Sequence, residues 1–496
     1  MNKTESNKQL EVLQFLGITT KIILILISVI QGMIVIRLLS ISEYGLVGIV
    51  LAVSSIVGVY QHLGLGIGTL REVASVKGND AVSRVFSTSF FARLSITLPI
   101  AFILFLLADK IAINIYHRPE IIFGIKITAF VILANGIQEI GFNVLNGIQK
   151  FKSVFLLQIL NSILNLMLVV GFIYFWNYNG YFVGNLIATI IFCILFIIFT
   201  YLAIGKKLIF PKKGEFIEIF KSIFTIGLFI YLGKIFFGLF NQSGILIFGY
   251  FASNDEVGYL RFAITYGSYI LAFSNAVNHI NITIMTKKFM QDKDTYKRDF
   301  IGNFNTFFYA TFFVITLMIL FSSEIIEVLA GKPYLVIQPI VVISVFAFFI
   351  HMLFEILCGS VYISSKDLRG YLISYVILAA ISALSIYLFV ALGLGKVGVL
   401  LGMFLGTFAT FLFSVFRIWK MLRMWVFNRY AIVIMLISIP GIALGTMNVN
   451  IWYRVVLFVL YFTGFWYLTR KFRIFDLLET LKLSFAKIRK SLSKVT

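Results

Sequence analysis

Long runs without a single charge recur from one end of this sequence to the other, as at 153–175 and 370–392. A helix rises 1.5 Å per residue, so about 20 apolar residues cross a hydrocarbon core of about 30 Å. Charged residues make up 13% of the chain, which is about half of what a soluble protein carries. A membrane β-barrel would show short alternating segments instead. The sequence therefore predicts an all-α polytopic membrane protein.

The positions of these runs predict fourteen transmembrane helices joined by short loops. The predicted spans are 15–39, 44–68, 87–108, 120–146, 153–175, 180–203, 222–251, 257–284, 301–323, 335–361, 370–392, 396–417, 430–446 and 449–469. Lys and Arg gather in alternate loops, and the loops richer in them are expected on the cytoplasmic side. This pattern predicts that both chain ends lie in the cytoplasm, and the short loops leave no room for a soluble catalytic domain.

The formal net charge is +21, but the basic residues lie in short loops between spans and form no separate basic domain. Their distribution argues against nucleic acid as a partner and is explained by membrane topology. Cys193 and Cys358 both fall in apolar runs, so we expect them to be packing residues. We predict no disulfide, no metal site and no bound cofactor.

Two loops suggest an internal repeat. Ser42-Glu43-Tyr44-Gly45 and Asp255-Glu256-Val257-Gly258 each join one long apolar run to the next. The alignment that places Glu43 on Glu256 also brings Lys21 onto Lys234. Six spans lie on either side of the basic loop between them, so the halves would form a parallel repeat. The predicted domains are an N-lobe at 1–204, a cytoplasmic linker at 205–221, a C-lobe at 222–420, and spans 13 and 14 with a basic tail at 421–496.

Four segments, in order, resemble one known family. IRLLSISEYGLVGIV at 36–50 is similar to the first-loop signature of polysaccharide flippases, and LGLGIGTLREVAS at 63–75 resembles the Gly-rich end of their second span. LNGIQKFKSVFLLQILNSILNLMLVV at 145–170 and ILIFGYFASNDEVGYLRFA at 245–263 are similar to their joins between spans 4 and 5 and between spans 7 and 8. The chain thus looks like an O-antigen or capsule (Wzx-type) flippase of the multidrug/oligosaccharidyl-lipid/polysaccharide exporter superfamily.

The resemblance implies a transporter of the bacterial plasma membrane and not an enzyme. Such proteins move undecaprenyl-pyrophosphate-linked oligosaccharide from the inner to the outer leaflet. A proton or sodium gradient is the candidate driving force for this chain, with transport that uses no ion gradient as the alternative. Membrane lipids, a polysaccharide polymerase and a chain-length regulator are the implied partners. The chain departs from the family where many relatives carry an aspartate, because it reads Asn241-Gln242-Ser243 there.

Arg261 is the strongest candidate for binding a pyrophosphate, because arginine holds phosphate oxygens bidentately. It stands four residues inside the eighth predicted span, where it could also reach the outer headgroups. The polar stripe below it favours a cavity wall, although polar helix packing would also produce a stripe. That stripe comprises Thr265, Ser268, Asn275 and His279.

Other intramembrane charges are candidates because such charges usually face a cavity. Lys234 and Lys21 are candidates for substrate contact, with snorkelling to the surface as the alternative. Arg37 and Arg71 lie near span ends, and the family resemblance adds them to the predicted cavity lining.

Two neighbouring spans carry amide stripes at helical spacing. Amides offer both donors and acceptors, so they suit sugar hydroxyls, but they also suit hydrogen bonds between the two helices. Among them, the predicted cavity residues are Asn135, Gln138 and Asn143 in span 4 and Gln158 and Asn161 in span 5.

Three residues are candidates for ion coupling. Glu139 could neutralise a cation such as Lys126 or Arg93, or could itself bind a proton or Na⁺. His351 and Glu355 share a face of the tenth span, as a proton-coupling pair or a buried structural hydrogen bond.

Three other functions compete with this prediction. A lipid II flippase would show the same charge pattern. A multidrug or cation antiporter of the same superfamily would need a carboxylate-rich cavity, whereas cations outnumber carboxylates among the predicted intramembrane charges. A membrane polysaccharide polymerase or ligase would need a larger outer loop than this chain has.

Overall fold

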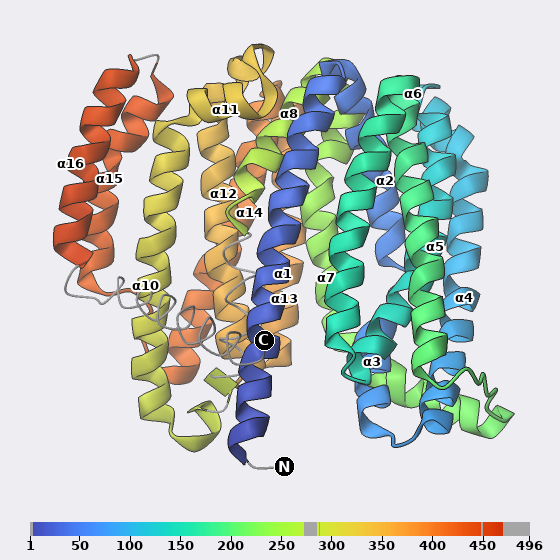
Figure 1. Cartoon of the computed structure of the whole chain (residues 1–496). Helices are drawn as coiled ribbons and strands as arrows, with labels where there is room; N and C mark the ends of the chain where they lie inside the picture. Colours follow the sequence, from blue (N-terminus) through green and yellow to red (C-terminus); the bar gives the residue numbers. More distant parts are fainter. Residues whose placement is uncertain (1–2, 272–284, 287, 448–449, 470–496) are drawn as a thin grey trace, which may run out of the picture. The chain divides into compact units, whose positions relative to one another are not determined.

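The computed structural model describes residues 3–271, 285–286, 288–447 and 450–469, and these residues contain helices and no strand (Figure 1). The α-helices are α1 (Lys3–Leu38), α2 (Ile41–Val59), α3 (Leu65–Ser75), α4 (Asn79–Lys110), α5 (Ile121–Gly147), α6 (Phe151–Ala203), α7 (Lys213–Phe251), α8 (Asn254–Ser268), α10 (Lys293–Leu320), α11 (Ser322–Ala330), α12 (Gln338–Leu357), α13 (Leu368–Ala391), α14 (Gly395–Leu422), α15 (Arg429–Thr446) and α16 (Ile451–Thr469). Two π-helical segments, η1 (Ile111–Ile115) and η3 (Cys358–Ile363), and one 3-10 segment, η2 (Lys332–Ile337), complete the set.

Ten helices in the described part of the chain are long and apolar enough to cross a membrane. The predicted class, an all-α polytopic membrane protein, is thereby confirmed. The shorter apolar helices α15 and α16 cover the two last predicted spans. The predicted eighth span, 257–284, lies partly outside the described residues.

Helix α6 contains two of the predicted spans, 153–175 and 180–203. Its path turns at Trp176 and Asn177, which has a φ of 47°. The two halves pack so closely that a Cβ on Gly184 would lie 2.7 Å from the carbonyl oxygen of Leu168. Glycine therefore permits a helical hairpin at this point.

The chain forms two compact units. The N-terminal unit comprises Leu16–Phe262 and Tyr375–Gly402, and the C-terminal unit comprises Met1–Phe15, Ala263–Ser374 and Met403–Thr496. In the N-terminal unit α5 packs between α4 and α6, and these three helices run side by side in Figure 1. The candidate site described below lies entirely in the N-terminal unit.

The second predicted span is not continuous. We expected one helix over 44–68, but α2 ends at Val59 and α3 begins at Leu65, with a turn between them. In that turn Leu63 and Gly64 have positive φ values of 38° and 72°. Glycines at 64, 66 and 68 also lower the helix propensity of this segment, which is the physical reason for the break.

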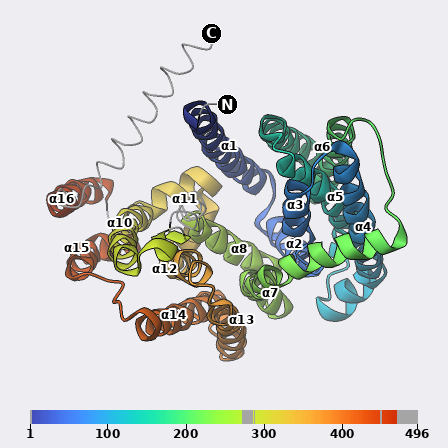
Figure 2. The same ribbon diagram turned by 90° about the horizontal axis from the view of Figure 1, so that it is seen from below.

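The first part of α7 does not follow the predicted span of 222–251 but begins earlier, at Lys213. In Figure 2 it lies across the ends of α3 and α4. Its residues Ile219, Phe220 and Ile223 pack into a core with Val73 of α3 and Val82 of α4. An amphipathic segment with apolar residues three and four apart has the pattern for lying on a surface in this way. The first part of α7 thus packs against both α3 and α4 and fixes the position of α3.

Helices α2 and α8 meet at their first turns through two glycines that the predicted repeat makes equivalent. A Cβ on Gly45 would lie 2.1 Å from the carbonyl oxygen of Asn254, and one on Gly258 would lie 2.2 Å from that of Ile41. The alignment that defines the repeat places Gly45 on Gly258, and it also places Ile41 on Asn254. Each helix therefore supplies one glycine and one carbonyl oxygen to the contact. Two copies related by a two-fold axis produce this reciprocal pattern. The contact is thus the one expected if the two segments are copies of each other.

Candidate functional site

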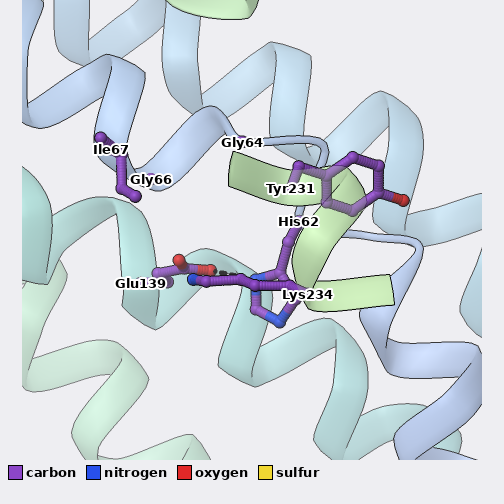
Figure 3. A pocket seen from close by; sticks show the side chains of 7 residues that line it. All are labelled: His62, Gly64, Gly66, Ile67, Glu139, Tyr231 and Lys234. Carbon is purple, nitrogen blue, oxygen red and sulfur yellow. Dashed lines mark hydrogen bonds and ion pairs between the residues drawn. The ribbon is translucent and has the colours of Figure 1, made fainter. Parts of the chain in front are cut away.

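A small pocket lies beside the break between α2 and α3. The break, the start of α3, the middle of α5 and the part of α7 opposite them supply its walls (Figure 3). The residues that line it are His62, Gly64, Gly66, Ile67, Glu139, Tyr231 and Lys234. It is therefore a polar site at the place where the second predicted span leaves the helical path.

Glu139 is the centre of the polar contacts. Its Oε2 accepts a hydrogen bond from Nη2 of Arg93, at 2.5 Å, and makes a 2.8 Å contact with Nδ1 of His62. The Arg93 side chain is fully buried, and its Nη1 donates to the carbonyl oxygen of Gln61 at 2.5 Å. Arg93 thus ties the backbone of the break to a carboxylate on α5. A buried guanidinium requires such a partner, because arginine does not lose its proton in proteins.

Lys234 adds a further positive charge. Its side chain extends from α7 towards Glu139 (Figure 3), and the residue is exposed. Lys234 and Glu139 line the pocket with one charge of each sign, and Arg93, buried behind Glu139, adds a second positive charge, so the cluster has an excess of one positive charge before His62 is counted. Positively charged side chains that converge on a concave site are typical of anion binding. In the described residues no group of three or more His, Cys, Asp or Glu could hold a metal ion.

Gly66 makes close packing possible beneath the carboxylate. A Cβ at this position would lie 2.4 Å from Oε1 of Glu139 and 2.9 Å from Nδ2 of Asn143. Asn143 is buried and donates to the carbonyl oxygen of Glu139 one turn earlier on α5. Glycine at the start of α3 therefore lets the break approach α5 closely enough for His62 to reach Glu139.

The structure brings two of the predicted site residues together, Lys234 and Glu139, with Asn143 beside them. Of the two cations proposed for Glu139, Arg93 is its partner, and the alternative, Lys126, instead pairs with Asp109 at 3.0 Å.

Arg261 lies in the N-terminal unit but not among the residues that line this pocket. Its guanidinium stands 4.2 Å from the centre of the Tyr44 ring, and its Nη1 donates to the Tyr44 carbonyl oxygen at 2.8 Å. Its Cδ would be 2.8 Å from a Cβ on Gly48. These contacts bind it to the first turns of α2, and its role in a substrate cavity stays a prediction.

The amide stripes have mixed surroundings. Asn165, which follows Asn161 by four residues in span 5, accepts from Gln31 of α1 at 2.8 Å and donates to Asn185 in the second half of α6 at 3.0 Å. This amide therefore serves helix packing. The predicted cavity amides Gln138, Gln158 and Asn161 are half-buried, and Asn135 is exposed.

The remaining predicted residues stand apart from the pocket lining. Lys21 and Arg37 on α1 and Arg71 on α3 are exposed. In the C-terminal unit, Nε2 of the fully buried His351 lies 3.5 Å from Oε1 of Glu355. Asn275 lies outside the described residues, as does His279.

His62 is the site residue that the sequence does not single out. It stands inside an apolar run that reads as one continuous span, and its contact in the site is with Glu139 on another helix, α5, further along the chain. The signal that could have found it is the glycine triplet at 64, 66 and 68, which indicates a broken helix next to a histidine.

Comparison with known families gives one match over most of the chain. The model of the "Polysaccharide biosynthesis protein" family matches residues 34–339, which include all the residues that line the pocket. Comparison with curated proteins found no match.

Solved structures share the fold at low sequence identity. The lipid II flippase MurJ in an inward closed conformation has a TM-score of 0.70 at 14% identity, over 94% of this chain and 99% of that one. An inward-facing multidrug resistance MATE family transporter of the MOP superfamily has a TM-score of 0.63 at 16% identity, over 83% and 99% of the two chains. The Vibrio cholerae MATE transporter VcmN in its bent form has a TM-score of 0.53 at 17% identity, over 84% and 98%.

These findings confirm the family resemblance seen in the sequence and the predicted multi-pass membrane fold. The family match covers more than half of the sequence, and the fold is shared with the multidrug/oligosaccharidyl-lipid/polysaccharide exporters. The chain belongs to the polysaccharide biosynthesis protein family and is a multi-pass membrane protein with the fold of that superfamily.

Proposed function

We propose that this protein is a flippase that moves a polyprenyl-pyrophosphate-linked oligosaccharide from the inner to the outer leaflet of the bacterial plasma membrane by alternating access. In this proposal the pocket beside the α2–α3 break contacts the pyrophosphate. The observation that carries the proposal is the excess of one positive charge in the cluster of Arg93, Glu139 and Lys234 at that pocket, in a chain of a polysaccharide biosynthesis family.

The chemistry of such a substrate fits the pocket. A pyrophosphate diester carries two negative charges that the apolar interior of a bilayer does not stabilise. Lys234 offers an exposed ammonium, and Arg93 neutralises the single carboxylate that would otherwise repel the substrate. A cationic drug would be repelled by the positive charge of this cluster, so the multidrug antiporter is the weaker alternative.

Lipid II flipping is the second candidate, supported by the fold likeness to the lipid II flippase over 94% of this chain. Lipid II is also joined to its lipid through a pyrophosphate, so the pocket suits either substrate. The two candidates differ in the phenotype that loss of the gene should cause. Loss of a polysaccharide flippase removes surface polysaccharide, whereas loss of a lipid II flippase stops cell-wall synthesis.

The test is deletion of the gene in its host, followed by complementation with variants at equal protein level. We expect deletion to remove surface polysaccharide and to accumulate its lipid-linked intermediate in the inner leaflet. Lys234→Ala should fail to restore the polysaccharide, whereas the matched control Lys126→Ala, which removes an ammonium paired with Asp109 outside the pocket, should restore it. Normal polysaccharide after deletion, or full restoration by Lys234→Ala, would contradict the proposal.

A further inference from the structure

His62 lines the pocket, and one of its two ring nitrogens is held by Glu139. Its Nδ1 lies 2.8 Å from Oε2 of Glu139, which also accepts from Arg93. A carboxylate held by a permanent guanidinium charge is an acceptor, so Nδ1 of His62 must be the donor. In the neutral ring the proton then sits on Nδ1, and Nε2 is left with a lone pair. The contact to Glu139 therefore fixes which nitrogen takes up a second proton.

The groups around His62 determine what that second proton would do. Glu139 faces it from α5, Arg93 stands behind Glu139 on α4, and Lys234 and Tyr231 face the same pocket from α7. The side chain of His62 is 36% exposed, and His62 is one of the residues that line the pocket. With neutral His62 the charges of these groups sum to one positive charge, and with protonated His62 they sum to two.

We propose that the pocket takes up a proton at Nε2 of His62 when it binds the anionic group of its substrate, so that anion affinity falls as pH rises. The inference rests on the proposed function, because it assumes that the pocket is the anion subsite. A neutral Nε2 presents a lone pair that repels a phosphate oxygen. The protonated ring presents an N–H donor and a charge in the same place, which attracts it.

The direction of the pH dependence follows from reciprocal linkage. If the anion binds protonated His62 more tightly, then bound anion must raise the proton affinity of His62 by the same factor. Histidine changes charge in the range from about pH 5 to 8. Within that range binding should be strongest at the acidic end, and proton uptake should accompany it.

The test uses the full-length protein in lipid nanodiscs with UDP-glucose as the probe. This soluble sugar pyrophosphate diester keeps its two negative charges across the range, so its own titration does not enter. We expect its dissociation constant to rise about tenfold from about pH 5.5 to about pH 8, as one partly screened charge would produce. Calorimetry in buffers of different ionisation enthalpy should record proton uptake on binding.

Two variants of His62 separate its charge from its shape. His62→Gln keeps a donor for Glu139 but cannot take up a proton, so its binding should be weak and independent of pH, without proton uptake. His62→Arg carries a permanent charge, so its binding should be as tight as that of the wild type at the acidic end of the range and equally independent of pH. Thermal unfolding of each variant shows that it is folded.

The outcomes separate this inference from the proposed function. If the wild type binds the probe and Lys234→Gln weakens binding, but His62→Gln keeps the wild-type pH slope, the proton linkage is wrong and the anion subsite stands. If the wild type does not bind the probe at any pH, or if Lys234→Gln binds it as tightly as the wild type, the anion subsite is wrong and the linkage fails with it.

Discussion

The first turns of α2 and α8 are equivalent in sequence and differ in what they bind. Both follow a serine, Ser40 or Ser253, and both carry a glutamate three residues later, Glu43 or Glu256, at equivalent positions of the repeat. Glu43 folds back so that its carboxylate accepts from the backbone N–H of Ser40 at 2.9 Å. Glu256 instead accepts from Lys396 at 2.7 Å. The serine and the glutamate are thus shared by the two helix starts, whereas the partners of the two glutamates differ.

The same comparison separates Gly48 from Arg261. These residues are also equivalent in the repeat, and the side chain of Arg261 lies against Gly48. A side chain at position 48 would occupy the space that Arg261 fills, so the symmetric contact has room for only one of the two. The contact between the helix starts is therefore symmetric at Gly45 and Gly258. It is asymmetric at Gly48 and Arg261, because only one of these two equivalent positions carries a charge. The charged cluster at His62 also has no counterpart in the second half of the repeat. The alignment pairs Glu139 with the uncharged Met352 and Arg93 with the uncharged Thr306.

The largest effect should come from the paired glycines. Gly45→Ala and Gly258→Ala each place a Cβ about 2 Å from a backbone carbonyl oxygen that cannot rotate away, and each should destabilise the fold by about 3 kcal/mol. Gly171→Ala is the matched control, because nothing lies within 4 Å of its Cβ position on α6. Thermal unfolding in detergent measures all three. A clear loss of stability in only one of the variants Gly45→Ala and Gly258→Ala would contradict the two-fold interpretation.

Arg261→Ala should have a smaller effect on stability. It removes a hydrogen bond to the Tyr44 carbonyl and a cation–π contact with the Tyr44 ring, which together stabilise by about 2 kcal/mol. Arg298→Ala, at an arginine whose side chain is 79% exposed, is the control. If the predicted cavity role also holds, surface polysaccharide should disappear at normal protein level. Unchanged unfolding with lost polysaccharide would assign Arg261 to the substrate path alone.

The helix caps should show the smallest effects and should rank in a fixed order. Ser40→Ala removes the side-chain half of a reciprocal cap at α2, in which Ser40 Oγ accepts from the backbone N–H of Glu43, and should cost about 1 kcal/mol. Ser253→Ala removes a single weak contact of 3.4 Å with the N–H of Glu256 and should cost a few tenths of that, roughly 0.3 kcal/mol. Unfolding in denaturant would rank the two. Equal losses would show that the caps have not diverged.

The sequence was sufficient for the fold class and for two of the seven residues that line the pocket, Lys234 and Glu139. Apolar length alone predicts a polytopic helical protein, and an intramembrane charge such as Lys234 or Glu139 is rare enough in an apolar run to mark a site. The sequence could not pair Glu139 with Arg93 instead of Lys126, which is much closer to it along the chain. That choice depends on how α4 and α5 are rotated against each other, which apolar periodicity does not specify.

The break between α2 and α3 was missed, and the neighbours of Arg261 could not be named, for a similar reason. The break at Tyr60–Gly64 leaves the hydropathy of the second span high, so a length-based reading carries the helix through it. Arg261 was expected to face a substrate path because polar residues continue its stripe. A stripe defines a helix face but not the neighbours of that face. The first turn of α2 is one neighbour of Arg261, and its place on a substrate path stays a prediction.

The central claim is that the pocket beside the α2–α3 break binds the pyrophosphate of a lipid-linked sugar. Native mass spectrometry of the purified full-length protein with an undecaprenyl-pyrophosphate-linked sugar tests it directly, with Lys234→Gln and Lys126→Gln compared at equal concentration. We predict that Lys234→Gln loses most of the bound lipid, by about tenfold as expected for one charge-assisted contact, and that Lys126→Gln binds like the wild type. Equal binding by all three proteins would contradict the claim.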